Sequence, residues 1–402
     1  MIKRQDYLNK LFIWKDKPVI KIVTGIRRSG KSTLLKMYME ELRRLGIDDS
    51  GMIYINMESL ENEKFQDYKI LYQHVKKRWN KKKSPLYIFI DEVQRIPSWE
   101  KVVLSFFSEK MGDIVISGSN STLLSGELAS LLAGRYVEIP VFPLTFSEFL
   151  EFREVKDPSP VLFNEYLKFG GMPGIHHLEW NQDVIYEYLN AIFDTIILKD
   201  IVARYNIRNV ALLEKIIRFI FDNIANIFSA NSIIEFLKKE KRKISIETIY
   251  NYLEYLKKSL VIYSAPRFDI IGKKILEFRE KFFVADLGLR HSLLSFRRDD
   301  ISKLMENIIF IELRKRGYRI YTGQFGDREI DFIAEKEGKI IYIQVAYLLT
   351  SEKTINREFE VLLNIPDNYP KMVVSMDQYF QEEIAGIQHI HLWDFLLNKE
   401  LL

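Results

Sequence analysis

The sequence predicts an α/β fold built on a parallel sheet, followed by an all-α/winged-helix domain and a small α/β domain. Three observations carry this prediction. Apolar runs alternate with helical patterns up to about residue 142, which is typical of a parallel sheet with right-handed crossovers. Three helical patterns and a strand hairpin follow between residues 211 and 289. From about residue 304, one more helical pattern precedes three strand-like runs.

The composition indicates several buried cores and no thiol chemistry. The chain has 402 residues, 47% of them hydrophobic, which predicts more than one domain. No cysteine is present, which excludes disulfides and thiolate metal sites. The longest apolar helical stretch, 211–228, is interrupted by charged residues, and the first residues lack the apolar segment of a secretory signal. We therefore expect a cytoplasmic protein with no membrane partner.

The charge is balanced overall but uneven along the chain. A net charge of +4 results from 59 basic and 55 acidic residues, so the molecule as a whole gives no argument for nucleic acid. Basic clusters occur at 76–83 and 238–243. Such clusters are usually solvated helix ends or loops, and a phosphate-contacting patch is the alternative.

The first predicted domain, 1–153, alternates strands and helices. Its expected strands are 18–24, 52–58, 85–93, 113–121 and 136–142. Its expected helices are 31–46, 71–79 and 99–112. A cluster of prolines and polar residues at 154–160 marks the end of this domain. Residues 163–228 then read as mainly helical, interrupted by a glycine pair in KFGGMPGI.

The stretch GIRRSGKS, residues 25–32, satisfies the pattern G-x-x-x-x-G-K-[ST] between a strand and a helix. Its glycines let the backbone wrap closely, so that successive N–H groups and the helix N-terminus face phosphates. Lys31 is expected to reach the β- and γ-phosphates of ATP, and the Ser32 hydroxyl to bind Mg²⁺. The residues expected to line this nucleotide site are Gly25, Arg28, Ser29, Gly30, Lys31, Ser32 and Thr33.

Two acids at the end of the run YIFIDEV are the expected partners of this loop. Asp91 is predicted to hold Mg²⁺ through water, and Glu92 to polarise the attacking water. Paired acids at a strand end are also common as simple solvated termini. After the strand 113–121, Asn120 or Ser119 is a candidate to orient that water, with turn formation as the alternative.

Three arginines near the site have open roles. Arg27 and Arg28 stand where side chains point away from the phosphates, so we expect supporting electrostatics, by packing across the loop or pairing with an acid of a lid. Arg135 precedes the last strand of the domain. It is a candidate arginine finger acting on a neighbour's nucleotide, which implies a homo-oligomer, or it is a surface arginine in a turn.

The predicted winged helix comprises helical patterns at 211–225, 229–239 and 245–259, and strands at 260–268 and 273–286. Its recognition helix is 245–258, with exposed-face candidates Thr248, Tyr250, Asn251 and Tyr255. Phosphate contacts are expected in or near the wing from Arg267, Lys273, Lys274 and Arg279. Winged helices also dock proteins, so DNA and a protein partner both remain open.

The motifs GIRRSGKST, FIDEV, ISGSNS, LLAGRY and KFGGMPG together resemble a family of prokaryotic AAA+-type P-loop ATPases that carry a C-terminal domain of unknown function. The resemblance covers nearly the whole chain. It implies an ATPase core at 1–153, a helical lid at 154–210, a winged helix at 211–296 and a restriction-endonuclease-like domain at 297–402. By position, the family's Walker A motif falls on residues 25–32, its Walker B acids on Asp91 and Glu92, its sensor on Asn120 and its finger on Arg135.

The nuclease-like domain that this resemblance implies departs from an active pattern. Such sites need an acid on a helix, an acid on a strand and E-x-K on the next strand, where carboxylates bind the metal and lysine assists water. Glu306 and Asp331 supply the first two acids, but the E-x-K positions hold Gln344 and Ala346. We therefore expect an inactive nuclease-like domain.

The sequence thus predicts a Mg²⁺-dependent ATPase that couples its nucleotide cycle to DNA binding or remodelling through a winged helix. The alternative is a slow, nucleotide-gated switch that docks a protein partner. An ATP-regulated nuclease is a minor alternative, disfavoured by Gln344 and Ala346.

Overall fold

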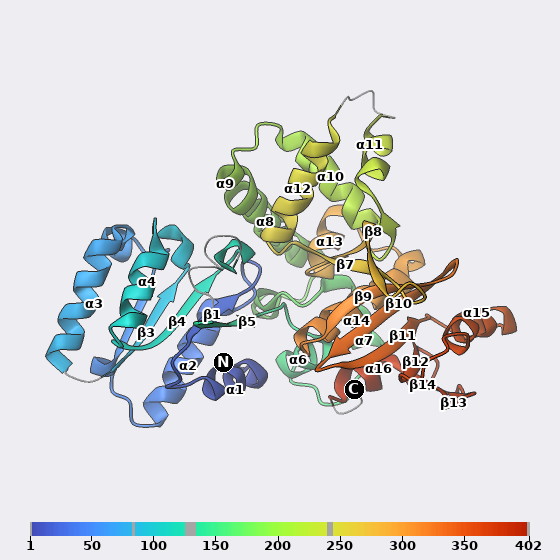
Figure 1. Cartoon of the computed structure of the whole chain (residues 1–402), viewed down its shortest axis with the longest axis horizontal. Coiled ribbons are helices and arrows are strands. Elements are labelled where there is room, and N and C mark those ends of the chain that lie inside the picture. Colours follow the sequence, from blue (N-terminus) through green and yellow to red (C-terminus); the bar gives the residue numbers. More distant parts are fainter. Residues whose placement is uncertain (1, 83–84, 125–133, 239–243, 400–402) are drawn as a thin grey trace. The chain divides into compact units, whose positions relative to one another are not determined.

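The computed structural model describes residues 2–82, 85–124, 134–238 and 244–399 (Figure 1). The chain forms two compact units. The first unit contains residues 1–142 and 258–260, and the second contains residues 143–257 and 261–402. The first unit ends ahead of the boundary expected at residue 153, and the division into four domains stays a prediction.

A parallel sheet forms the centre of the first unit. Among the described residues it has five strands in the order β2-β3-β4-β1-β5, and all neighbouring strands run parallel. This confirms the predicted parallel α/β fold. The strands are β1 (Ile20–Thr24), β2 (Met52–Asn56), β3 (Leu86–Asp91), β4 (Gly112–Gly118) and β5 (Tyr136–Pro140).

Helices cover both faces of this sheet, which explains why its strands are mainly apolar. Side chains alternate between faces along a strand, so Val23 packs with α1 and α2 while Ile22 packs with α3 and α4. The helices are α1 (Gln5–Ile13), α2 (Lys31–Arg44), α3 (Tyr68–Lys82) and α4 (Trp99–Ser108). Short 3₁₀ turns connect them at Asp49–Gly51, Leu60–Gln66, Val93–Arg95 and Ser121–Leu124.

The second unit is largely helical up to residue 257. Its helices in this part are α6 (Phe146–Phe152), α7 (Pro160–Phe169), α8 (Gln182–Thr195), α9 (Ala203–Tyr205), α10 (Val210–Asp222), α11 (Ala230–Lys238) and α12 (Ile246–Lys258). The π-helical turn Ile196–Val202 joins α8 to α9. The later helices are α13 (Leu287–Leu294), α14 (Ile301–Lys315), α15 (Glu352–Leu363) and α16 (Leu392–Leu397). The three helices expected before the hairpin are therefore present as α10, α11 and α12.

A mixed sheet runs through the second unit. Among the described residues it has nine strands in the order β13-β14-β12-β11-β10-β9-β7-β8-β6. The expected hairpin is β7 (Ile262–Asp269) with β8 (Lys274–Val284), and β6 (Ile227–Phe228) pairs with β8. The remaining strands are β9 (Arg319–Phe325), β10 (Arg328–Lys336), β11 (Lys339–Val345), β12 (Lys371–Ser375), β13 (Glu383–Ile384) and β14 (Ile387–His391). Because β7 pairs in parallel with β9, the predicted winged helix and nuclease-like domain share this sheet.

The glycine pair of the KFGGMPG motif lies against the start of α13. A Cβ atom on Gly171 would lie 2.0 Å from the Leu144 carbonyl oxygen, so the two backbones approach too closely for a side chain. The Gly171 N–H donates to the Asp286 carboxylate at 2.6 Å, and Asp286 also accepts from the Leu289 N–H at the N-terminus of α13. The motif therefore joins a segment near residue 170 to a helix more than a hundred residues later.

His291 in α13 is a buried histidine that the second unit keeps neutral. Its Nδ1 atom lies 3.1 Å from the Lys168 carbonyl oxygen. Burial, followed by the charge of Arg290, lowers the pKa of His291 to about 3. We expect this residue to make the second unit sensitive to mild acid.

A histidine whose pKa falls on folding stabilises the native state above the unfolded-state pKa of about 6.5, and this stability is lost as the pH falls toward the folded-state value. Between about pH 7 and pH 5 the loss from His291 is about 2 kcal/mol. Urea unfolding at both pH values measures it. His291→Asn keeps a donor for the Lys168 carbonyl but does not titrate here, so its stability should depend less on pH. The same pH dependence in both proteins would refute this assignment.

No helix within the described ranges combines the length and apolarity needed to cross a membrane.

Candidate nucleotide-binding site

The loop between β1 and α2 forms a tight backbone cradle. A Cβ atom on Gly25 would lie 2.2 Å from the Val141 carbonyl oxygen and 2.8 Å from Ser29 Oγ. Arg28 and Gly30 both have left-handed backbone angles, with φ of +67° and +99°. Ser29 Oγ is buried and has no hydrogen-bond partner among the described residues. This closely wound loop at a helix N-terminus fits a chain of phosphates.

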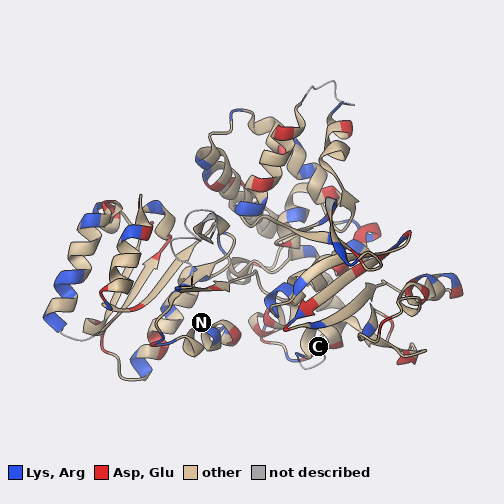
Figure 2. Cartoon of the chain, viewed as in Figure 1, with Lys and Arg blue, Asp and Glu red and all other residues tan. Residues whose placement is uncertain are grey.

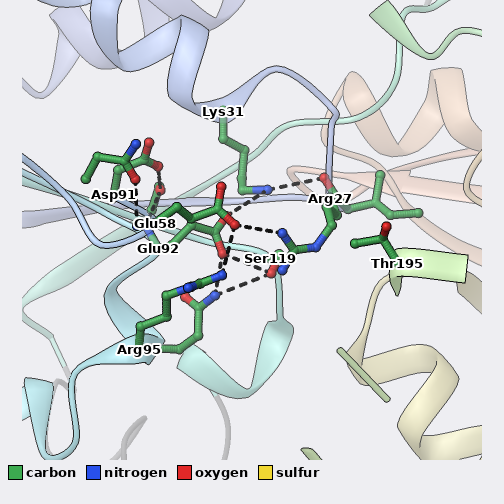
Figure 3. Close-up of polar contacts among 12 residues, drawn as sticks. Arg27, Lys31, Glu58, Asp91, Glu92, Arg95, Ser119 and Thr195 are labelled. Atoms are coloured by element: carbon green, nitrogen blue, oxygen red, sulfur yellow. Dashed lines mark hydrogen bonds and ion pairs between the residues drawn. The ribbon is translucent and has the colours of Figure 1, made fainter. Parts of the chain in front are cut away.

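Lys31 is the first residue of α2, and its ammonium group is held over the loop. It donates to the carbonyl oxygens of Gly25 at 3.0 Å and Ile26 at 3.2 Å. Its Nζ atom also lies 3.7 Å from Glu92 Oε1 (Figure 3). Ser32 and Thr33 follow in the first turn of α2, as the sequence predicts. The loop, Lys31 and Glu92, which directly follows β3, are thus brought together at the carboxyl edge of the sheet.

Asp91 ends β3 and is fully buried. Its carboxylate accepts hydrogen bonds from Ser117 Oγ on β4 and from the Tyr54 hydroxyl on β2, the latter at 2.9 Å. Burial, followed by the charge of Asp91, raises the pKa of Tyr54, so the phenol remains a donor. Contacts from both neighbouring strands therefore fix the orientation of Asp91.

Glu92 turns away from Asp91 because its backbone is left-handed, with φ of +57°. Its Oε2 atom accepts from Gln94 Nε2 at 2.5 Å and from Ser119 Oγ at 3.2 Å. The Asp91 carboxylate therefore contacts the neighbouring strands β2 and β4, and the Glu92 carboxylate faces Lys31. This separation suits two different tasks, a metal contact and the orientation of water.

The two loop arginines differ. Arg27 donates to Glu58 Oε1 at 2.8 Å, and Arg95 donates to the same oxygen at 3.0 Å (Figure 3). Burial would raise the pKa of Glu58, but Arg27 and Arg95 hold it below its usual value. This partner of Arg27 directly follows β2 in the first unit, and pairing of either loop arginine with an acid of a lid stays a prediction. Arg28 is exposed.

Asn120 is buried two residues beyond β4, and the neighbouring Ser119 makes the contact with Glu92. Arg135 is exposed at the opposite edge of the sheet, where its carbonyl oxygen accepts from the Ile20 N–H at 2.8 Å. The five residues of β1 separate Arg135 from the loop, about 16 Å at the usual rise of a strand. Residues 131–133 of the LLAGRY motif lie outside the described residues.

Several residues that support this site were not predicted from the sequence. Arg4 is buried and donates to the carbonyl oxygens of Ser29 at 3.0 Å and Phe142 at 2.9 Å, so it ties the loop to the end of the first unit. Tyr54 and Gln94 hold the two acids. No local motif marks these residues, because their positions depend on the pairing of strands and on the turn after β3.

The nuclease-like positions also meet in space. The Asp331 N–H donates to Gln344 Oε1 at 3.1 Å, and the ammonium of Lys281 contacts both Asp331 and Glu306. Ala346 is buried in the apolar cluster beside β11. Lys281 of β8 was not among the residues predicted for this group.

The three nucleic-acid candidates Lys273, Lys274 and Arg279 are exposed on the β7–β8 hairpin. Tyr255 was expected on the exposed face of α12, but it stacks on Tyr205 with ring centroids 3.9 Å apart. That expectation is wrong for Tyr255.

Arg267 and the two basic clusters are the other sequence features considered for contact with nucleic acid. Arg267 donates to Gln324 of β9 at 2.7 Å. Figure 2 shows basic and acidic residues interspersed over both units. Residues 239–243 of one basic cluster and residue 83 of the other lie outside the described residues.

Comparisons with known proteins match the first unit to a known domain. A family model described as an AAA domain matches residues 17–150, and a model described as a domain of unknown function (DUF8612) matches residues 161–300. An uncharacterised protein of Haemophilus influenzae is 38% identical over 401 residues, 99% of each chain. The uncharacterised protein MJ1544 of Methanocaldococcus jannaschii is 31% identical over 85% of this chain and 77% of that one.

Solved structures are more distant. The Walker-type ATPase PABY2304 of Pyrococcus abyssi is 19% identical with a TM-score of 0.48, covering 73% of this chain and 96% of that one. The ORC1 protein of Aeropyrum pernix, solved in complex with DNA, is 14% identical with a TM-score of 0.34, covering 73% and 92%.

The chain belongs to the family of the Haemophilus influenzae and Methanocaldococcus jannaschii proteins, and its first unit is a P-loop ATPase unit of AAA type. The resemblance to AAA+-type ATPases is confirmed at this level. The roles of individual site residues, the winged helix and the nuclease-like fold stay predictions.

Proposed function

We propose that this member of an AAA-domain family is a Mg²⁺-dependent ATPase whose nucleotide cycle is coupled to DNA binding through a winged helix in its second unit. The observation that carries the ATPase half is the approach of Lys31 Nζ to Glu92 Oε1, 3.7 Å apart beside the loop, with Asp91 preceding Glu92 at the end of β3.

The residues divide the work of phosphoryl transfer. The loop N–H groups and Lys31 bind the phosphates of ATP, while Ser32 and Asp91 are the residues suited to hold Mg²⁺, which supplies charge neutralisation. Phosphates that attract Lys31 weaken its ion pair with Glu92. Ser119 and Gln94 then keep the Glu92 carboxylate oriented, so that it can accept a proton from the attacking water.

Arg135 is proposed to act on the nucleotide of a neighbouring subunit, because in its own unit it lies at the other edge of the sheet from the loop. Arg135→Ala is expected to lower turnover about 10³-fold in assembled protein, since an arginine finger stabilises transition-state charge. Turnover measured against protein concentration tests this. Adding a Glu92→Gln subunit to native protein should also change activity non-linearly.

Arg44→Ala is a matched control, because Arg44 is an exposed arginine at the end of α2. It should leave turnover unchanged. If native turnover per chain is constant at all concentrations and Arg135→Ala behaves like Arg44→Ala, the finger assignment fails.

DNA coupling is supported by the exposed cations of the hairpin that follows α12, a position where phosphate contacts are common. Neutralising Lys273, Lys274 and Arg279 together to glutamine should abolish the ATP-dependent mobility shift of duplex DNA at low salt. Losing three phosphate contacts should also reduce the dependence of the dissociation constant on salt.

A triple glutamine variant at Lys156, Lys339 and Lys353 is the charge-matched control, because these lysines are exposed elsewhere in the second unit. It should bind DNA as the native protein does. Equal weakening of DNA binding by both variants, or no DNA binding by native protein at low salt, would refute the proposed coupling to DNA.

A protein partner is the second candidate, and exposed apolar side chains favour it. Ile271 and Ile275 are 65% and 53% exposed at the same hairpin. Apolar groups beside cations are suited to a protein surface better than to a phosphate backbone. Slow hydrolysis that is indifferent to DNA would support this candidate.

A further inference from the structure

The second unit contains three carboxylates that converge on one ammonium group. Lys281 Nζ lies 2.5 Å from Glu306 Oε2, 2.8 Å from Glu329 Oε1 and 3.0 Å from Asp331 Oδ1. The Lys281 side chain is only 2% exposed. The four residues come from three elements, β8, β10 and α14, so the cluster is a product of the tertiary fold.

The remaining polar atoms around Asp331 already have partners. Its Oδ2 atom accepts from the Val345 N–H at 2.9 Å, and its own N–H donates to Gln344 Oε1 at 3.1 Å. Backbone contacts therefore orient Asp331 so that its Oδ1 atom faces Lys281. Asp331 and Glu329 lie two residues apart on β10 and so share one face of the sheet.

The charge arrangement shows that this ammonium is the cation of the cluster. Burial lowers the pKa of Lys281, but Asp331, Glu306 and Glu329 together hold it well above its usual value. Burial, followed by the charge of Asp331, raises the pKa of Glu306. The Lys281 ammonium contacts three carboxyl groups, of which Glu306 and Asp331 are 12% exposed and Glu329 is 41% exposed.

Carboxylate oxygens converging on one point are also the ligand type that Mg²⁺ and Mn²⁺ prefer. A cavity of about 760 Å³, lined in part by Glu329 and Gln344, opens beside the cluster and gives a path from solvent. Within the described residues, however, no group of three or more such side chains is arranged to hold a metal ion. The point where the carboxylates meet is taken by the lysine.

We propose that Lys281 is a built-in cation that takes the place of a divalent metal ion in this carboxylate site, so that the native site is closed to metal and becomes a metal site once the ammonium is removed. The sequence positions that read Gln344 and Ala346 fit this arrangement, because a site with an internal cation needs neither a further carboxylate nor a second lysine. The cation also ties the β7–β8 hairpin to α14 and β10.

The test is a titration of nucleotide-free protein with MnCl₂, with free Mn²⁺ followed by electron paramagnetic resonance. Lys281→Met keeps an unbranched apolar side chain, one atom shorter, and removes the charge. This variant should bind one more Mn²⁺ per chain than native protein, and the added site should disappear in Lys281→Met/Asp331→Asn. Lys339→Met, at an exposed lysine of β11, should bind as native protein does.

Equal Mn²⁺ binding by native protein and Lys281→Met would overturn the proposal, as would an added site that survives Asp331→Asn. If Lys281→Met does not fold, Asp331→Asn in the otherwise native chain decides the matter. This single variant should bind as much Mn²⁺ as native protein. Loss of one bound ion would show that the native carboxylates already hold metal, and the lysine would not be their cation.

Discussion

Replacing Glu92 by glutamine is expected to remove ATP turnover and leave ATP binding intact. The amide keeps the size of the side chain and can still accept from Ser119 Oγ, but it cannot take a proton from water. Loss of a general base lowers rates by about 10²- to 10⁴-fold. Phosphate release under saturating Mg²⁺-ATP gives the rate, and equilibrium binding of a fluorescent ATP analogue gives the affinity.

Glu63→Gln is the matched control, because Glu63 is an exposed glutamate in the 3₁₀ turn that follows β2. It should retain native turnover and binding. If Glu92→Gln hydrolyses ATP at the native rate, Glu92 is not the residue that activates water. If Glu92→Gln loses binding as well, its role is to hold the loop through Lys31.

Replacing Gly171 by alanine is expected to destabilise the second unit by about 3 kcal/mol or more. The added methyl group would lie 2.0 Å from the Leu144 carbonyl oxygen, and backbone atoms cannot yield as a side chain does. Hydrogen bonds to Leu144 and Asp286 also fix the Gly171 backbone on both sides. Urea unfolding measures the loss, and a low yield of folded protein would be its most severe form.

Gly272→Ala is the comparison, because a methyl group there would meet only side-chain atoms of Asp269 and Lys274. Its stability should stay within about 0.5 kcal/mol of the native value, as for most surface changes. Gly171→Ala with native stability would mean that the segments around residues 144 and 286 can separate at no cost, contrary to the packing described for the KFGGMPG motif.

The core of the first unit could be predicted from the sequence because its signals are local. A strand buried on both faces is mainly apolar, and residues 25–32 combine glycines, a lysine and a serine at fixed spacing. Asp91 and Glu92, at the end of β3 and directly after it, are predictable for the same reason. The residues that hold those acids are not. Tyr54 and Ser117 reach Asp91 because β2 and β4 flank β3 in one particular register.

The carboxylate site of the second unit is still harder to predict from the sequence. The pattern predicts Glu306, Asp331 and Gln344 as neighbours, and the structure brings them together. Lys281 lies 50 residues before Asp331 in the chain, on a hairpin whose parallel pairing with β9 leaves no local signal. The sequence therefore predicts the loss of a lysine at position 346, but it cannot predict that another lysine enters the cluster from β8.

Steady-state ATP hydrolysis with Mg²⁺, measured for native protein beside Lys31→Ala, tests the central claim most directly. Lys31 contacts both the loop and Glu92, so its loss should remove phosphate binding and turnover together. The account predicts Mg²⁺-dependent hydrolysis by native protein and none above background by Lys31→Ala. Hydrolysis at the native rate by Lys31→Ala, or native protein that neither binds nor hydrolyses ATP, would contradict it.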